Sequence, residues 1–156
     1  MLSLNEIYKY AKKGVAEWQY FLGKLYEYGD IKQGISKDIM ESLYWYKLAS
    51  NRGHSLALNK YGIYSYRHGC HNIAYKYLKK SYLLGSIVGK YNYYFFILNH
   101  PEYVNQSYTS KYISKILLEF KKFKKDVNNL NIDDKNLNSK LDTLITSLQL
   151  FTPLKI

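Results

Sequence analysis

Cysteine, proline and long apolar runs are all scarce in this chain of 156 residues, and each scarcity excludes a class of protein. The single cysteine, Cys70, cannot form an intrachain disulfide, so a disulfide-stapled secreted domain is excluded and a reducing compartment is expected. No apolar run approaches the roughly 20 residues of a membrane span, and the N-terminus lacks the pattern of a secretory signal. These observations predict a soluble, cytoplasmic protein.

Acidic residues are also in deficit. The chain has 23 Lys and Arg against 12 Asp and Glu, which gives a formal net charge of +11. A basic surface attracts nucleic acid, anionic lipid or an acidic protein, and charge alone does not choose among them. The 19 tyrosines have an apolar body and a polar tip, so they suit half-buried seams and contact surfaces. The length and composition predict one globular domain with room for a core.

Catalytic and metal-binding signatures are absent from the sequence. His68, Cys70 and His71 are the densest group of possible metal ligands, but they crowd one tight turn, whereas zinc ligands usually come as spaced pairs. A cysteine nucleophile at Cys70 has no indicated oriented base or oxyanion hole. The carboxylates are scattered, and the glycines punctuate helices rather than form a phosphate-binding loop. The sequence therefore predicts a protein that is not an enzyme and that uses no metal or cofactor.

An internal repeat runs through the first two thirds of the chain. Its anchors are Gly14, Gly53 and Gly85, and the first two are followed at the same spacing by Gly23 and Gly62. The stretches that precede Gly53 and Gly85 also align, with small residues at shared positions. The anchors are 39 and 32 residues apart, and a repeat of this length indicates stacked supersecondary units.

Each copy of the repeat is predicted to form two helices, because turn and capping residues bound segments of helical character. Asp38 is the expected N-cap of one helix, with Glu41 placed as in a capping box, and Gly29 and Gly53 suit helix ends. A helix without a partner is expected before Gly14. The other expected helices of the repeats cover residues 15–28, 38–52, 55–68, 73–84 and 87–98.

This pattern resembles the Sel-one-like repeat family, a relative of the tetratricopeptide repeats. The first copy fits the family pattern at Gly14, Leu22, Gly23, Tyr26, Gly29, Asp38, Trp45, Tyr46, Ala49 and Gly53. The second fits at Gly53, Ala57, Gly62, Gly69, Ala74 and Gly85. Trp18, Tyr61 and Tyr77 depart from the pattern, and in the third copy Gly89 keeps a small position while Tyr94 replaces a glycine. The resemblance implies an all-α solenoid of stacked antiparallel helix pairs over residues 1–100.

The repeat positions also predict which side chains pack between the helices. Two short helices cannot bury their apolar faces alone, so neighbouring pairs stack into a continuous core. Small residues let helices approach closely, and large aromatic residues fill the grooves that remain. The aromatic cluster around Trp45 is therefore interpreted as packing, with Tyr44 left to face outward. The expected structural positions are Leu22, Gly23, Tyr26, Trp45, Tyr46, Ala49, Gly53, Ala57, Gly62, Ala74 and Gly85.

Residues 101–156 are expected to form a helical cap that belongs to the same domain. Residues 110–126 place apolar side chains on one helical face and lysines mostly on the other. A last helix is expected to open at Asp133 and to end before Pro153. Solenoids need terminal elements with a polar outer face, and these two helices fit that role. The lysines of residues 121–125 are interpreted as a solvated face, with binding to an anionic membrane as a lesser alternative.

The resemblance implies a role in binding other proteins, with the first helix of each pair on the inner surface. Tyr and Arg are common hot spots, and the positive charge favours an acidic partner. Some bacterial members of the family are immunity proteins, so the specific hypothesis is a cytoplasmic protein that neutralises a toxin by occluding it. A regulatory or secretion adaptor is the alternative. Nucleic-acid binding is disfavoured, because the tyrosines fall at core positions. The expected partner contacts are Glu17, Tyr20, Lys24, Glu27, Asn59, Tyr66 and Arg67.

Overall fold

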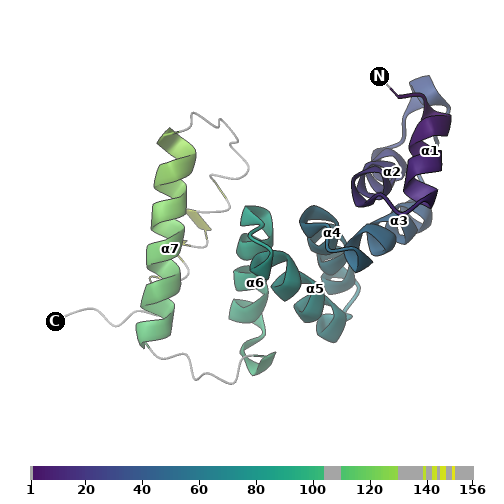
Figure 1. Cartoon of the computed structure of the whole chain (residues 1–156). Coiled ribbons are helices and arrows are strands. Elements are labelled where there is room, and N and C mark those ends of the chain that lie inside the picture. Colours follow the sequence, from purple (N-terminus) through teal and green to yellow (C-terminus); the bar gives the residue numbers. More distant parts are fainter. Residues whose placement is uncertain are drawn as a thin grey trace. The chain divides into compact units, whose positions relative to one another are not determined.

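The computed structural model describes residues 2–103 and 110–129, and beyond them residues 139, 142, 143, 145, 146 and 149. Two short 3-10 turns, Ile31–Gln33 and Pro101–Tyr103, accompany the α-helices, and no β-strand occurs in the described residues. The predicted all-α fold class is therefore confirmed. The α-helices (Figure 1) are α1 (Leu4–Lys12), α2 (Ala16–Tyr28), α3 (Ile39–Asn51), α4 (Ser55–Arg67), α5 (His71–Leu83), α6 (Ile87–Asn99) and α7 (Ser110–Asn129).

The chain divides into two compact units, Met1–Phe96 and Ile97–Ile156. The first unit holds the repeats, and α7 belongs to the second. The capping role of residues 101–156 stays a prediction, and the helix expected to open at Asp133 lies outside the described residues. None of the helices among the described residues has both the length and the apolar character of a membrane span.

Local capping signals explain where the helices begin. The Asp38 carboxylate accepts a hydrogen bond from the backbone N–H of Glu41 at 3.0 Å, so it caps α3 as predicted. Helix α1 begins with a complete capping box that was not predicted. The Ser3 hydroxyl accepts a hydrogen bond from the backbone N–H of Glu6, and the Glu6 carboxylate accepts one from the backbone N–H of Ser3. The fifth helix begins at His71, slightly earlier than predicted, and Cys70 takes the N-cap position without a side-chain hydrogen bond.

Buried side chains form a core that passes from one helix pair to the next. Ile7, Leu22 and Trp45 bring α1, α2 and α3 together. Tyr46 of α3 then joins a second cluster with Ala57 of α4. Leu58, Ala74 and Leu78 continue the buried layer through α4 and α5. Helices α2, α3 and α4 therefore bury apolar surface against neighbours on more than one side, which is the packing of an all-α solenoid.

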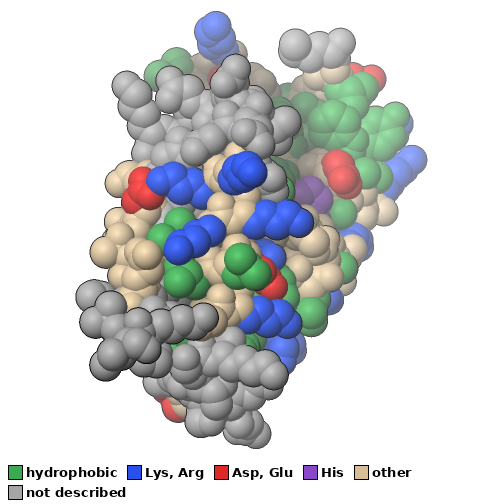
Figure 2. All heavy atoms as spheres, turned by 90° about the vertical axis from the view of Figure 1, so that its left-hand side faces the viewer, with side chains coloured by type: hydrophobic (Ala, Val, Ile, Leu, Met, Phe, Trp, Pro, Cys, Tyr) green, Lys and Arg blue, Asp and Glu red, His purple; other side chains and the backbone are tan. Residues whose placement is uncertain are grey.

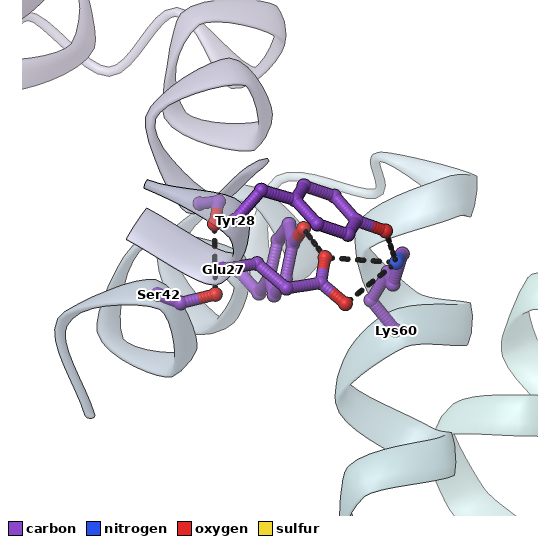
Figure 3. Close-up of polar contacts among 6 residues, drawn as sticks. Glu27, Tyr28, Ser42 and Lys60 are labelled. Carbon is purple, nitrogen blue, oxygen red and sulfur yellow. Dashed lines mark hydrogen bonds and ion pairs between the residues drawn. The ribbon is translucent and has the colours of Figure 1, made fainter. Parts of the chain in front are cut away.

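Two glycines act by letting helices approach closely. A Cβ atom at Gly23 would lie 2.5 Å from ring carbons of Tyr46, and one at Gly62 would lie 2.8 Å from the Leu78 side chain. Real Cβ atoms do not approach other atoms so closely. Glycine, which has no side chain, is therefore what allows α2 to contact α3 at Gly23 and α4 to contact α5 at Gly62. Near Gly23 the Ser42 hydroxyl donates to the Gly23 carbonyl at 2.8 Å (Figure 3).

The other expected structural positions divide into core and turn residues. Gly85 is exposed and Gly53 is half-buried, so neither fills the core. Both have positive φ angles, +79° for Gly85 and +81° for Gly53, and both follow the end of a helix, which is the place that the sequence pattern gives to Gly53. Tyr26 is half-buried, and its hydroxyl bonds that of Tyr8 at 2.5 Å across α1 and α2. The buried positions are Leu22, Gly23, Trp45, Tyr46, Ala49, Ala57, Gly62 and Ala74.

Candidate partner-binding face

The residues expected to meet a partner lie on α2 and α4, the first helices of their pairs. Glu17 and Lys24 of α2 and Arg67 of α4 are exposed. Tyr20, Glu27 and Tyr66 are half-buried, and Asn59 is buried. We define a surface, the α2–α4 face, by six exposed or half-buried side chains of these two helices. They are Glu17, Tyr20, Lys24, Tyr28, Leu56 and Arg67.

Glu27 lies at the centre of a polar cluster that joins α2, α3 and α4 (Figure 3). Both of its carboxylate oxygens accept hydrogen bonds from the Lys60 ammonium group at 2.8 Å, and one also accepts from the Tyr46 hydroxyl at 2.6 Å. Lys60 further donates to the Tyr28 hydroxyl at 3.2 Å. Glu27 was expected to contact a partner, but here its carboxylate links one repeat to the next.

The charges in this cluster stabilise one another. Burial and the hydrogen bond to the Glu27 carboxylate raise the pKa of the Tyr46 hydroxyl far above its usual value, so this group keeps its proton and remains a donor. Burial disfavours the charged form of Lys60, but its hydrogen bonds to Glu27 and Tyr28 raise its pKa overall. Lys60 therefore keeps its charge at neutral pH, and its contact with Glu27 holds α4 against α2.

Tyr20 and His54 form a second contact between the repeats. The two rings stack with centroids 4.4 Å apart, and Tyr20 also lies against Tyr46 with centroids 5.6 Å apart. His54 is the N-cap of α4, because its Nδ1 accepts a hydrogen bond from the backbone N–H of Ala57 at 3.2 Å. The Tyr20 ring is thus partly committed to packing, and its half-exposed remainder contributes to the α2–α4 face.

His54 is expected to make the free energy of unfolding depend on pH. Burial lowers the pKa of His54 below the usual 6.5, against an opposing effect of Glu17. A proton on Nδ1 would also abolish the N-cap hydrogen bond. Below pH 6.5 the unfolded chain binds this proton more readily than the folded chain, so the unfolding free energy falls as pH decreases through 6.5 toward the lowered value.

The measurement is urea denaturation at about pH 7.5 and about pH 5.5 for the wild type and His54→Asn. Asparagine can cap the helix but does not titrate. The His54→Asn variant should therefore lose less stability than the wild type between the two pH values. Equal losses in the two proteins would show that His54 does not cause the pH dependence.

Asn59 and Tyr66 connect α4 to α6 rather than face outward. Asn59 is only 4% exposed, and its side-chain oxygen accepts a hydrogen bond from the Asn92 amide at 2.8 Å. The Tyr66 ring packs edge-on against Phe96 with centroids 5.6 Å apart. The expectation that Asn59 is turned toward a partner is therefore wrong. Helix α6, the first helix of the third copy, covers this position, and the residue spacing within α4 does not report that neighbour.

Tyr28 and Leu56 belong to the α2–α4 face although they were not predicted. Tyr28 is 66% exposed, and it follows Lys24 at helical spacing on the same side of α2. Leu56 is exposed at the start of α4. The spacing 17, 20, 24 and 28 could have identified Tyr28, since residues three and four apart share a helix face.

The carboxylates of the first unit are largely used inside the protein. Internal hydrogen bonds reach the side chains of Glu6, Glu27, Asp30, Asp38 and Glu41. Lys24 and Arg67, in contrast, extend from the surface, and the sequence holds no Asp or Glu between Ser42 and Pro101. The surface around α4 therefore presents positive charge.

Candidate metal ligands do not converge in the structure. In the part of the chain that the structure describes, no three His, Cys, Asp or Glu side chains could together hold a metal ion. His68 stacks on Tyr64 with ring centroids 4.0 Å apart, and its Nδ1 lies 2.8 Å from the Tyr64 carbonyl oxygen. Cys70 is exposed nearby as a free thiol.

Comparison with known proteins gives one result. The family model of the Sel1 repeat matches residues 16–54 and 71–86, which contain α2, α3 and α5. A search of curated proteins and a search of solved structures found no match. Sel1 repeats generally mediate protein–protein interaction. Over these residues the chain is similar to Sel1 repeats, and the stacked helix pairs agree with that similarity.

Proposed function

We propose that this chain binds an acidic protein partner through the α2–α4 face. The observation that carries the proposal is the Glu27–Lys60–Tyr46 cluster, which lies beside this face and joins its two helices. Because these contacts fix α2 against α4, the exposed side chains are held in place before binding. A preorganised surface loses less conformational entropy on association, so more of the contact energy appears as affinity.

The exposed side chains match what acidic partners require. Lys24 and Arg67 supply positive charge, and Arg can hold a carboxylate through two parallel hydrogen bonds. Tyr28 and Leu56 add apolar area that can be removed from water on binding. The charges are expected to speed association, and the aromatic and apolar residues are expected to slow dissociation.

The specific form of the proposal is a cytoplasmic immunity protein of a bacterium, which neutralises a toxin by covering its active site. Such a role needs a rigid, complementary surface and no catalytic group. A toxin with acidic residues around its active site would be neutralised if this face bound those residues.

The proposal is tested with the protein encoded beside this gene. Coexpression of the two is expected to restore growth if the neighbour is toxic. Lys24→Glu and Arg67→Glu are each expected to weaken binding about tenfold and to reduce protection. Lys12→Glu on α1 is the control. Lys12 is exposed but lies outside the face, and its substitution changes the net charge by the same amount.

The possible outcomes separate the parts of the proposal. A neighbour that is harmless, or a toxin whose effect persists on coexpression, would overturn the immunity role. A partner whose affinity is unchanged by both reversals on the α2–α4 face would overturn the assignment of the face. Binding of several unrelated regulatory proteins through the same face would instead identify an adaptor.

A further inference from the structure

One face of α7 is apolar and buried. Ile113, Ile116 and Phe120 are almost inaccessible to solvent. They follow the spacing of a single helix face, as predicted from the sequence. The apolar side of α7 is therefore already packed, and it is not available to lie in a membrane as the apolar side of a surface-bound helix must.

The opposite face of α7 is a row of lysines around one leucine. We define this lysine face by Lys115, Leu118, Lys121, Lys122 and Lys125, all of which are exposed. Leu118 is 69% exposed. The view onto the side of the chain that holds α7 shows Lys and Arg side chains gathered there, with apolar side chains between them (Figure 2).

The spacing of the lysine face is regular. Residues 115, 118, 122 and 125 follow one another at alternating steps of three and four, so they lie on one line along the helix. Lys121 flanks this line. Lys124 points to another side, where its ammonium group pairs with the Asp142 carboxylate. One lysine of the helix is thus used internally, and the lysine face is presented to solvent.

The composition of this face favours a protein partner over nucleic acid. Lysine offers a compact, hydrated charge, and none of the five residues can stack on a base or read its edge with the geometry of Arg, Asn or Gln. A phosphate backbone also has nothing to cover Leu118. A protein partner with carboxylates around an apolar residue would match both the charges and the leucine, in the usual arrangement of apolar centre and polar rim.

We infer that the lysine face of α7 is a second docking surface, and that it takes an acidic amphipathic helix of a protein partner. Glutamates or aspartates at steps of three and four on that helix would meet the lysines, while an apolar residue among them would cover Leu118. The surface is independent of the α2–α4 face, so either assignment can fail without the other.

The test uses a fluorescent helical peptide with glutamates at steps of three and four around one leucine, titrated with the full chain. Wild-type affinity is expected to fall as salt rises from about 50 mM to about 200 mM, because exposed charges are screened. The triple variant Lys115→Glu, Lys122→Glu, Lys125→Glu is expected to lose about tenfold or more in affinity. Leu118→Ala is expected to weaken binding at both salt concentrations, since apolar contact is not screened.

The matched control is the triple variant Lys76→Glu, Lys79→Glu, Lys80→Glu on α5. These three lysines are also exposed and closely spaced, so the change in net charge is identical. An equal loss of affinity in the α5 triple variant would overturn the inference, because net charge alone would then explain binding. An unchanged affinity in Leu118→Ala would overturn it as well, because the docked helix would not reach the leucine.

Two further probes test whether the lysine face binds nucleic acid or an anionic membrane instead of a protein. They are a DNA duplex of about 20 base pairs, and vesicles of phosphatidylcholine and phosphatidylserine at about 3:1. The inference requires that the peptide bind more tightly than either. Tighter binding of the duplex or of the vesicles, lost in the α7 triple variant and kept in the α5 control, would reassign the face to nucleic acid or to the membrane surface.

Discussion

Replacement of Trp45 by alanine is expected to lower the free energy of unfolding by about 3–5 kcal/mol, as for other large truncations in a packed core. The indole is 4% exposed and lies among Ile7, Ala11 and Leu22, where three helices meet. Its N–H donates to the Glu41 carboxylate at 2.9 Å. Alanine would leave a cavity at this junction that α1 could fill only by moving.

The neighbouring Tyr44 provides the control for this prediction. It is 54% exposed and touches Trp45 only edge-on, with ring centroids 5.2 Å apart. Tyr44→Ala is therefore expected to change stability by less than about 1 kcal/mol. Chemical denaturation of both variants measures the difference. An unchanged melting temperature in Trp45→Ala, combined with loss of partner binding, would reassign Trp45 to a contact surface.

Gly23→Ala is expected to lower the free energy of unfolding by about 1–3 kcal/mol, which is the usual effect of overpacking a core. In an open helix the same change would be stabilising by up to about 1 kcal/mol, because alanine favours helix. Here the new Cβ atom would lie 2.5 Å from the Tyr46 ring. That ring cannot easily move aside, since it is buried and its hydroxyl donates to Glu27 at 2.6 Å.

A double-mutant cycle identifies the cause of this effect. Tyr46→Ala removes the ring, so Gly23→Ala in that background is expected to be neutral or stabilising. The difference between the two backgrounds, measured by urea denaturation, gives the energy of the close contact. If Gly23→Ala were equally destabilising in both, the clash with Tyr46 would not be its origin.

Much of the fold could be read from local patterns. The helix pairs follow from repeated glycines, from Asp38 as an N-cap and from aromatic residues at fixed offsets, and these signals act over a few residues. Burial of Trp45 and Tyr46 follows from their place in the repeat. Such features are local or recur from copy to copy, which is why one sequence was enough to predict them.

The candidate site could be predicted only in part. Lys24 and Arg67 are exposed as the pattern indicated, but Glu27 and Asn59 have partners more than thirty residues away, Lys60 and Asn92. A helix in a solenoid has a neighbouring helix on more than one side, so a polar residue that looks outward in its own pair can be covered by the next. Helical periodicity within one pair does not report that neighbour.

The sequence by itself determined the all-α class, the positions of the repeat helices and the residues that let them pack, because these depend on backbone preferences and on apolar spacing. The tertiary structure alone decided which polar side chains join the repeats and which remain for a partner. Tyrosine, asparagine, glutamate and lysine suit both a half-buried seam and a surface, so the distance to the next helix determines their role. On α7 it likewise decided that the apolar side is packed, which leaves Leu118 and its lysines as the exposed face.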